Sequence, residues 1–327
     1  MINGNLQKNT KETDIMSAQE RYLRKLAASK EPLDICLTND YAFRKIFKNK
    51  KVLKGFLMAL LCLSEEEIVD LEVTDPYEEG ECEEEKEGIL DVKVHLNNNT
   101  RLNLEMQNRM QEGWVERSIF YNCRMYTADF KHGMEYGGLE PCIHVGILDF
   151  NLMKREGFHH YVSLQDTKTG EMYSSKFVFH VIELKKLEET PEAERDELYR
   201  WARLIAAKSW EAVDMEAKGN PYREEAREEM KKINQDEVER WLYLRREMAV
   251  SDKVSQIASA ERRGRRQGEQ LKLISQIQTK YRKDKSLEII ADEVEEDVET
   301  IRKIYELICQ NPGESEEKIL NLLKVEE

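Results

Sequence analysis

The feature that most constrains the fold is a predicted β-hairpin at residues 88–109, GILDVKVHLNNNTRLNLEMQNR. Both arms alternate between apolar and polar side chains, which is the pattern of half-buried strands. The apolar positions are Leu90, Val92, Val94, Leu96, Leu102, Leu104 and Met106. Three asparagines at 97–99 separate the arms, and asparagine tolerates the left-handed backbone that a tight turn needs. We therefore expect two antiparallel strands with one buried face.

The pairing of the arms follows from burying both apolar faces together. This requires Val92 opposite Leu104, because a slip by one residue would turn one apolar set toward water. Asp91 then lies directly opposite Glu105, and two facing carboxylates repel each other. The same register pairs Val94 with Leu102 and Lys93 with Asn103. A hard divalent cation such as Mg²⁺ or Mn²⁺ would remove the conflict. An exposed hairpin face with both acids in water is the other interpretation, and spacing alone leaves both open.

The same residues carry a family resemblance. Asp91, followed after the turn by Glu105-Met106-Gln107, resembles the PD-(D/E)XK nuclease signature in its D…E-x-Q form. Leu90 stands where the signature has proline, and Gln107 replaces its lysine. Five motifs in this order resemble the recombination-promoting nuclease (Rpn)/putative transposase family over residues 33–190: TNDYAFRKIF (38–47), ILDVKV (89–94), LNLEMQNR (102–109), ERSIFYNCRMY (116–126) and VGILDFNL (145–152).

The resemblance implies a metal-dependent DNA endonuclease linked to recombination or transposition. Asp91, Glu105 and the backbone carbonyl of Met106 would hold Mg²⁺ or Mn²⁺. Gln107 would orient the attacking water or the scissile phosphate, but a neutral amide cannot act as a general base, so the metal must lower the pKa of the water. Lys93 shares the face of Asp91 and is a candidate substitute for the missing lysine.

A second acid, Asp40, has two interpretations. It could be a helix-borne acid near the metal, as in some nucleases of this type. It could also belong only to the cap of a helix, because Thr38-Asn39-Asp40 precedes the apolar positions Phe43 and Ile46. The capping interpretation is favoured.

Composition bounds the class of protein. The 327 residues are 40% apolar and 35% charged, and the longest apolar run is too short to span a bilayer. Six cysteines show no C-x-x-C pair, and residues 1–14 lack the apolar core of a signal peptide, so we expect a cytoplasmic protein without a membrane partner. The net charge of −14 argues against a protein that coats nucleic acid, but not against a local basic groove.

The order of elements predicts an α/β sandwich around a mixed sheet. Helices are expected at 38–47, 52–63 and between Gly113 and Gly133. Strands are expected at 68–73, 142–150, 159–164 and 176–184, together with the hairpin. This order agrees with the PD-(D/E)XK, restriction-endonuclease-like core that the resemblance implies. His159 and His160 are interpreted as ordinary strand residues, since no third metal ligand follows at a recognisable spacing.

The helix after Gly113 carries Arg117, Tyr121 and Arg124 at helical spacing. A basic and aromatic stripe beside a carboxylate pair suits contacts with the phosphates of double-stranded DNA. A solvated helix face would have the same composition, so both interpretations stay open.

The chain divides into an N-terminal arm (1–32), the nuclease-like domain (33–190) and a helical C-terminal region (191–327). One helix is expected over 222–250. The basic stretch 262–285 could contact nucleic acid or form an exposed helical linker, and the linker interpretation is favoured. Residues 286–308 resemble a helix-turn-helix tail, but the second helix begins with Asp297-Val298-Glu299, which favours protein contacts over base recognition. We assign no function to residues 261–327.

Two further hypotheses compete with the endonuclease. The first is a catalytically inactive DNA-binding or adaptor protein on a nuclease-like fold, which the acidic charge and Gln107 favour. The second is a helical scaffold that forms a homo-oligomer through its C-terminal region. Metal binding by Asp91 and Glu105 discriminates between them, because only the nuclease needs it.

Overall fold

The computed structural model describes residues 18–29, 31–74, 92–97, 99–128 and 130–325. The chain divides into two compact units, Met1–Met248 and Ala249–Glu327. The boundary expected near residue 190 falls inside the first unit, which begins its described part with helix α2 (Ala18–Ala27). No described helix is long and apolar enough to cross a membrane.

The hairpin forms with the predicted register. Strand β2 (Val92–Leu96) pairs antiparallel with β3 (Thr100–Gln107), with Val92 opposite Leu104 and Val94 opposite Leu102. Asn97 takes the left-handed backbone expected of the turn, with φ of 52°. Its side-chain oxygen also accepts hydrogen bonds from the backbone N–H groups of Val69 and Asp70, which ties the turn to the neighbouring strand.

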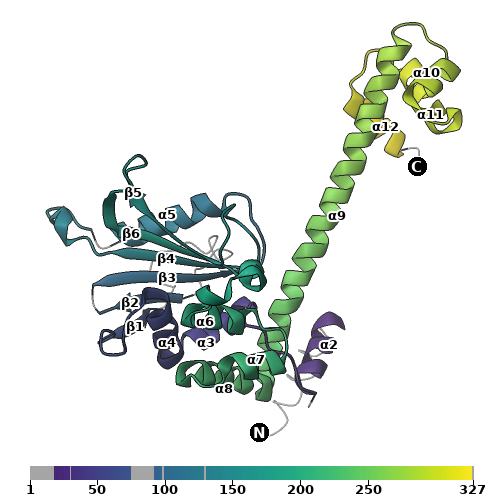
Figure 1. The fold of residues 1–327 in the computed structure, drawn as a ribbon. Helices are drawn as coiled ribbons and strands as arrows, with labels where there is room; N and C mark the ends of the chain where they lie inside the picture. Colours follow the sequence, from purple (N-terminus) through teal and green to yellow (C-terminus); the bar gives the residue numbers. More distant parts are fainter. Residues whose placement is uncertain (1–17, 30, 75–91, 98, 129, 326–327) are drawn as a thin grey trace, which may run out of the picture. The chain divides into compact units, whose positions relative to one another are not determined.

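The first unit is built on a mixed six-stranded sheet in the order β1-β2-β3-β4-β6-β5 (Figure 1). The other strands are β1 (Leu71–Thr74), β4 (Cys142–Leu148), β5 (His159–Gln165) and β6 (Met172–Glu183). The pairs β3–β4 and β4–β6 are parallel, and the remaining pairs are antiparallel. Three short 3-10 helices follow strands or loops at Tyr136–Gly138, Leu184–Glu189 and Glu192–Glu194. The predicted mixed sheet is confirmed.

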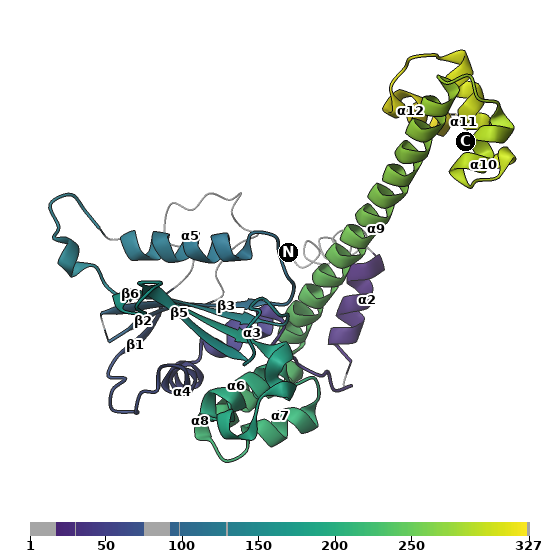
Figure 2. The ribbon, with the colours of Figure 1, turned by 45° about the horizontal axis from the view of Figure 1, so that its top comes forward.

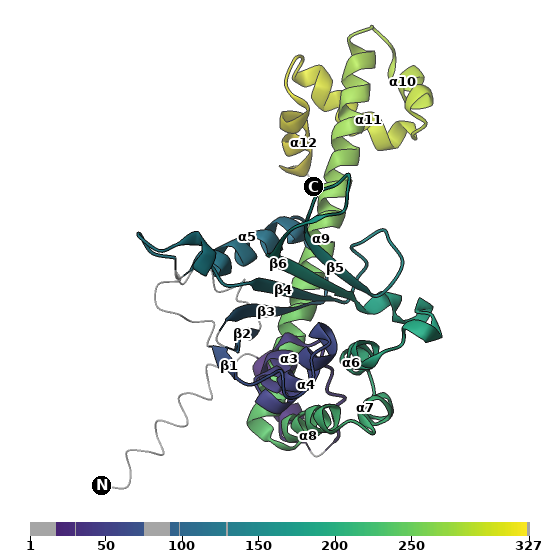
Figure 3. The same cartoon turned by 60° about the vertical axis from the view of Figure 1, so that its left-hand side comes forward.

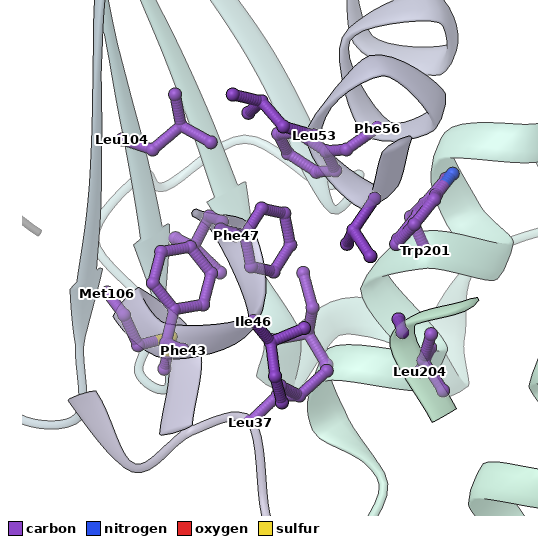
Figure 4. Close-up of a cluster of buried hydrophobic side chains, with 14 of the residues drawn as sticks. Leu37, Phe43, Ile46, Phe47, Leu53, Phe56, Leu104, Met106, Trp201 and Leu204 are labelled. Atoms are coloured by element: carbon purple, nitrogen blue, oxygen red, sulfur yellow. The ribbon is translucent and has the colours of Figure 1, made fainter. Parts of the chain in front are cut away.

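One face of the sheet packs against a layer of helices and forms the main core. These helices are α3 (Asp40–Phe47), α4 (Lys50–Leu61), α6 (Glu197–Ala206), α7 (Trp210–Ala217) and α8 (Pro221–Gln235) (Figure 3). Figure 4 shows Phe43 and Phe47 of α3 next to Leu104 and Met106 of β3, with Trp201 of α6 on the other side of Phe47. The alternation of β3 therefore sends Leu104 and Met106 into the core and leaves Asn103 and Glu105 on the opposite face.

Among the described elements, helix α5 (Trp114–Thr127) covers the opposite face (Figure 2). This helix is shorter than the span expected between Gly113 and Gly133. The ring of Trp114 lies directly on Gly146 of β4, where an added Cβ would come within 2.5 Å of Trp114 Cζ2. A glycine at this position lets α5 approach the sheet closely.

The prediction of one continuous helix over 222–250 is wrong. The helix is interrupted at Asp236, which lies between α8 and α9 (Glu237–Tyr281). Asp236 has an extended backbone, and its side chain accepts a hydrogen bond from the N–H of Glu239 at 2.9 Å. An aspartate that caps a new helix in this way ends the preceding one.

The described part of the second unit consists of helices and the short segments that connect them. The C-terminal portion of α9 packs with α10 (Leu287–Val294), α11 (Val298–Gln310) and α12 (Glu316–Val325) (Figure 1). These elements share a separate core that includes Ile274, Ile290 and Ile304. The two helices predicted within 286–308 are confirmed, and no described residue beyond Glu183 lies in a strand.

Candidate active site under helix α5

Two adjacent rows of paired residues, which include several polar side chains, cross the face of the sheet that α5 covers. In the first row, the register places Lys93 of β2 beside Asn103 of β3 and Asn103 beside His144 of β4. In the second row, Glu105 of β3 lies beside Gly146 of β4. A carboxylate, an imidazole and an amide therefore meet at the centre of the sheet, where neighbouring strands are covered by a helix.

Glu105 is the centre of this cluster, with only 3% of its surface exposed. Arg117 Nη2 lies 3.0 Å from Glu105 Oε1, and His144 Nε2 lies 3.8 Å from Oε2. Among the described residues, neither carboxylate oxygen has a hydrogen-bond partner of acceptable geometry. Burial raises the pKa of the Glu105 carboxyl, and the nearby Arg117 charge only partly opposes this rise.

His144 is buried against Glu105 and was not anticipated as a site residue. Burial, followed by the Arg117 charge, lowers the pKa of His144 to about 3, so the imidazole is neutral near pH 7. Its Nδ1 lies 3.2 Å from Asn103 Nδ2, and the rings of Trp114 and Phe179 flank it with centroids at 6.1 and 6.0 Å. In the sequence His144 reads as one residue of an apolar strand, CIHVGILDF, and only the register shows that it meets Glu105.

Helix α5 places one basic residue, Arg117, at this cluster. Trp114 packs on Gly146, and Arg117 follows one helical turn later, where it reaches Glu105. The Arg117 guanidinium also lies 5.5 Å from the centre of the Tyr121 ring and bonds Gln111 Oε1 at 3.1 Å. Of the residues expected to contact DNA, Arg117 therefore lies at the cluster, and Tyr121 lies next to Arg117. The third, Arg124, lies over the ring of Phe120 instead.

The comparisons with known proteins identify the family. A model of the PD-(D/E)XK nuclease family transposases matches residues 37–260, more than half of the chain. The chain belongs to this family. No curated protein and no solved structure matches. The match contains the whole described sheet and helix α5, so the buried cluster lies within the family domain.

The other residues expected at a PD-(D/E)XK nuclease site are placed as follows. Asp91 lies outside the described residues, so its position opposite Glu105 stays a prediction. Gln107 follows Glu105 on the same face, and its amide donates to the Arg109 carbonyl at 3.0 Å. The Met106 side chain lies in the core on the other face. Asp40 forms an ion pair with Arg246, while Asn39 supplies the N-cap of α3.

The side chains at this site can be compared with the ligands that a divalent cation needs. Within the described ranges, no three carboxylates, imidazoles or thiolates converge on one point. Glu105 nevertheless supplies two buried carboxylate oxygens without hydrogen bonds, and buried polar groups normally have partners. Carboxylate oxygens are the ligands that Mg²⁺ and Mn²⁺ prefer. These residues fit a cation that gains further ligands from outside the described set.

A second buried acid, Glu183, lies on the same face of the sheet, but its carboxylate, unlike that of Glu105, is fully hydrogen-bonded. Its carboxylate lies 2.7 Å from His160 Nε2 and 2.6 Å from Lys186 Nζ, and it also accepts from the backbone N–H groups of Leu152 and Met153. Every acceptor position is used, and Lys186 donates further to the Met153 carbonyl. This network holds the loop after β4 and leaves no ligand position. His160 is therefore a strand residue with a structural partner, while His159 bonds His180 at 2.9 Å.

Proposed function

We propose that this chain is a metal-dependent DNA endonuclease that acts in recombination or transposition. The single observation that carries the proposal is the buried Glu105 carboxylate, which lacks hydrogen-bond partners among the described residues and lies beside Arg117. A buried charge of this kind costs free energy unless a cation or hydrogen bonds compensate it. Membership of a nuclease family of transposases supports the same conclusion.

In this proposal Asp91, Glu105 and the Met106 carbonyl hold Mg²⁺ or Mn²⁺. Asp91 immediately precedes Val92, whose partner Leu104 immediately precedes Glu105. The bound ion would supply a water of lowered pKa and neutralise charge that develops on the phosphate. Gln107 would orient that water or the phosphate by hydrogen bonding, because its amide cannot take a proton.

Two other residues at the same face of the sheet carry the positive charge that Gln107 lacks. Arg117 is already beside Glu105, and its side chain is 25% exposed, so it can turn toward a DNA phosphate when a cation binds the carboxylate. Lys93 lies in the neighbouring row, opposite Asn103. Tyr121 and Arg124 would add further contacts with the backbone of double-stranded DNA along α5.

A catalytically inactive DNA-binding protein is the second candidate. The Arg117–Glu105 ion pair favours it, because this pair partly compensates the buried carboxylate without a metal. Under either candidate we propose a cytoplasmic protein, since the described cysteines are free thiols. Self-association through the C-terminal helices stays a prediction.

The proposal is tested with an Asp91→Ala variant in paired assays of plasmid nicking and thermal unfolding, each with Mg²⁺ and with EDTA. We expect the variant to lose Mg²⁺-dependent nicking and stabilisation by metal, while its melting temperature in EDTA stays level or rises slightly. The rise is bounded by the ~0.2–1 kcal/mol of a repulsive cross-strand pair. Full metal-dependent nicking by Asp91→Ala would place the active site elsewhere.

A further inference from the structure

The imidazole of His144 and the carboxylate of Glu105 are both buried and lie close together on the face of the sheet that α5 covers. Their exposed fractions are 1% and 3%, and they come from neighbouring parallel strands whose register pairs Glu105 with Gly146, two residues beyond His144 on the same face. Nε2 of His144 points toward Glu105 and has no hydrogen-bond partner in the described part of the chain. Two unsatisfied ligand atoms thus meet beneath α5.

We propose that His144 binds, through Nε2, the same divalent cation as Glu105, and that this nitrogen ligand makes the site select Mn²⁺ over Mg²⁺. The inference rests on the proposed function, because it concerns the cation of that site. It goes beyond that function in assigning a ligand from β4 and a preference between the two cations.

The distance between the two ligand atoms suits a shared ion. Two atoms that each lie about 2.1 Å from one ion are about 3.0 Å apart at a right angle and about 4.2 Å apart on opposite sides. Nε2 and Oε2 are 3.8 Å apart, which falls between these limits. The same separation is too long for a direct hydrogen bond. An ion between the two atoms would satisfy both without moving either strand.

Asn103 is placed to hold the imidazole in the form that binds metal. Ligation through Nε2 requires the ring proton on Nδ1, and metal-bound histidines usually donate that proton to a neighbouring oxygen. The Asn103 amide is 3.2 Å from Nδ1, and its Oδ1 has no hydrogen-bond partner among the described residues. A half-turn of the amide about its last side-chain bond brings Oδ1 to Nδ1 and satisfies both atoms. Asn103 is thus a positioning residue.

The preference for Mn²⁺ follows from the ligand type and from burial. Mg²⁺ takes oxygen ligands, keeps several waters and dehydrates reluctantly. Imidazole nitrogen suits transition-metal ions better than it suits Mg²⁺, while carboxylates suit Mn²⁺ as well as Mg²⁺. At this site one ligand is a nitrogen, and the Trp114 ring next to it limits the room for water. Both features penalise Mg²⁺ more than Mn²⁺.

The test is pulsed electron paramagnetic resonance of Mn²⁺ bound to the full chain at one equivalent. A directly bound imidazole gives nitrogen modulation of the echo, and growth on ¹⁵N-histidine changes that modulation without any mutation. We expect His144→Gln to abolish the modulation. The matched control is His180→Gln, which alters an equally buried histidine on the other face of the sheet. Competition with Mg²⁺ on the same samples measures the preference.

Each outcome decides the inference. Histidine modulation that His144→Gln removes and His180→Gln retains supports it, together with a Mn²⁺ preference that falls at least about tenfold in His144→Gln. Mn²⁺ binding without nitrogen modulation overturns the His144 ligand and leaves the proposed function standing. Modulation that persists in His144→Gln also overturns it. Absence of binding by either cation overturns both the inference and the proposed function.

Discussion

The two buried glutamates on the α5 face should respond oppositely to the same substitution. Glu105→Gln removes a charge whose pKa is raised by burial, so at neutral pH the charge costs more in desolvation than Arg117 returns. We expect Glu105→Gln to leave the free energy of unfolding unchanged or slightly higher in EDTA. Glu183→Gln instead leaves the buried Lys186 ammonium without its carboxylate, and breaking such a pair costs about 3–5 kcal/mol.

Bound metal should reverse the order of thermal stability of Glu105→Gln and the wild type, so that the wild type becomes the more stable protein. A ligand present at about 100 times its Kd stabilises the folded state by about 2.7 kcal/mol. For a unit of this size that corresponds to a melting temperature about 5–11 °C higher. The wild type and Glu183→Gln should gain this stabilisation with saturating Mn²⁺, and Glu105→Gln should gain none.

The assay is thermal unfolding followed by circular dichroism, with EDTA and with a Mn²⁺ series, on all three proteins. In EDTA, Glu183→Gln should melt about 6–20 °C below the wild type, and Glu105→Gln should melt close to it. If Glu105→Gln melts as low as Glu183→Gln in EDTA, Glu105 is a structural partner of Arg117 and its role as a metal ligand is refuted.

Three further predictions concern the surroundings of the site. Gly146→Ala should lower the free energy of unfolding in urea by about 1–3 kcal/mol, because the new Cβ would lie 2.5 Å from Trp114 Cζ2; an unchanged midpoint would contradict this. Burial, followed by the neighbouring His159, lowers the pKa of His180 in the folded protein from 6.5 to about 3. As pH falls below 6.5, the unfolded state therefore binds a proton at His180 before the folded state does, and the free energy of unfolding decreases. Between pH 8 and pH 5, the free energy of unfolding should therefore fall by about 2 kcal/mol less in His180→Gln than in the wild type. Urea unfolding at each pH measures this difference, and an equal fall in both proteins would contradict the prediction. Arg117→Met should weaken DNA binding and flatten the plot of log affinity against log salt by about 0.9, whereas an unchanged slope would show that Arg117 contacts no phosphate.

The hairpin could be predicted because its signal is local and periodic. Alternation in two arms with one polar turn admits a single register that buries both apolar faces, and β2 and β3 pair in that register. The buried alternation of β3 likewise separates Glu105 from the core, so its side of the sheet followed from Leu104 and Met106 alone. Glu105 could therefore be identified without knowledge of contacts between distant parts of the chain.

The partners of Glu105 could not be predicted in the same way. His144 is 39 residues further along the chain, in β4. The parallel pairing of β4 with β3 cannot be predicted from the local sequence pattern of either strand. Glu183 meets His160 only because β5 and β6 pair antiparallel, whereas Lys186 follows Glu183 by three residues in the chain. The break at Asp236 was missed for a different reason, since one capping side chain ended a helix within a periodic stretch. Local pattern thus identifies strands and faces, while contacts between distant residues depend on the order of strands in the sheet.

The central claim is that a cation bound at Glu105 supports cleavage of DNA. Its most direct test is nicking of supercoiled plasmid by the purified full chain over a series of Mn²⁺ concentrations, compared with thermal stabilisation over the same series. We predict that nicking is absent in EDTA, that it reaches half its maximum at the Mn²⁺ concentration that half-saturates the thermal shift, and that Glu105→Gln loses both responses. Nicking that persists in EDTA, or that Glu105→Gln retains at the wild-type rate, would contradict the claim.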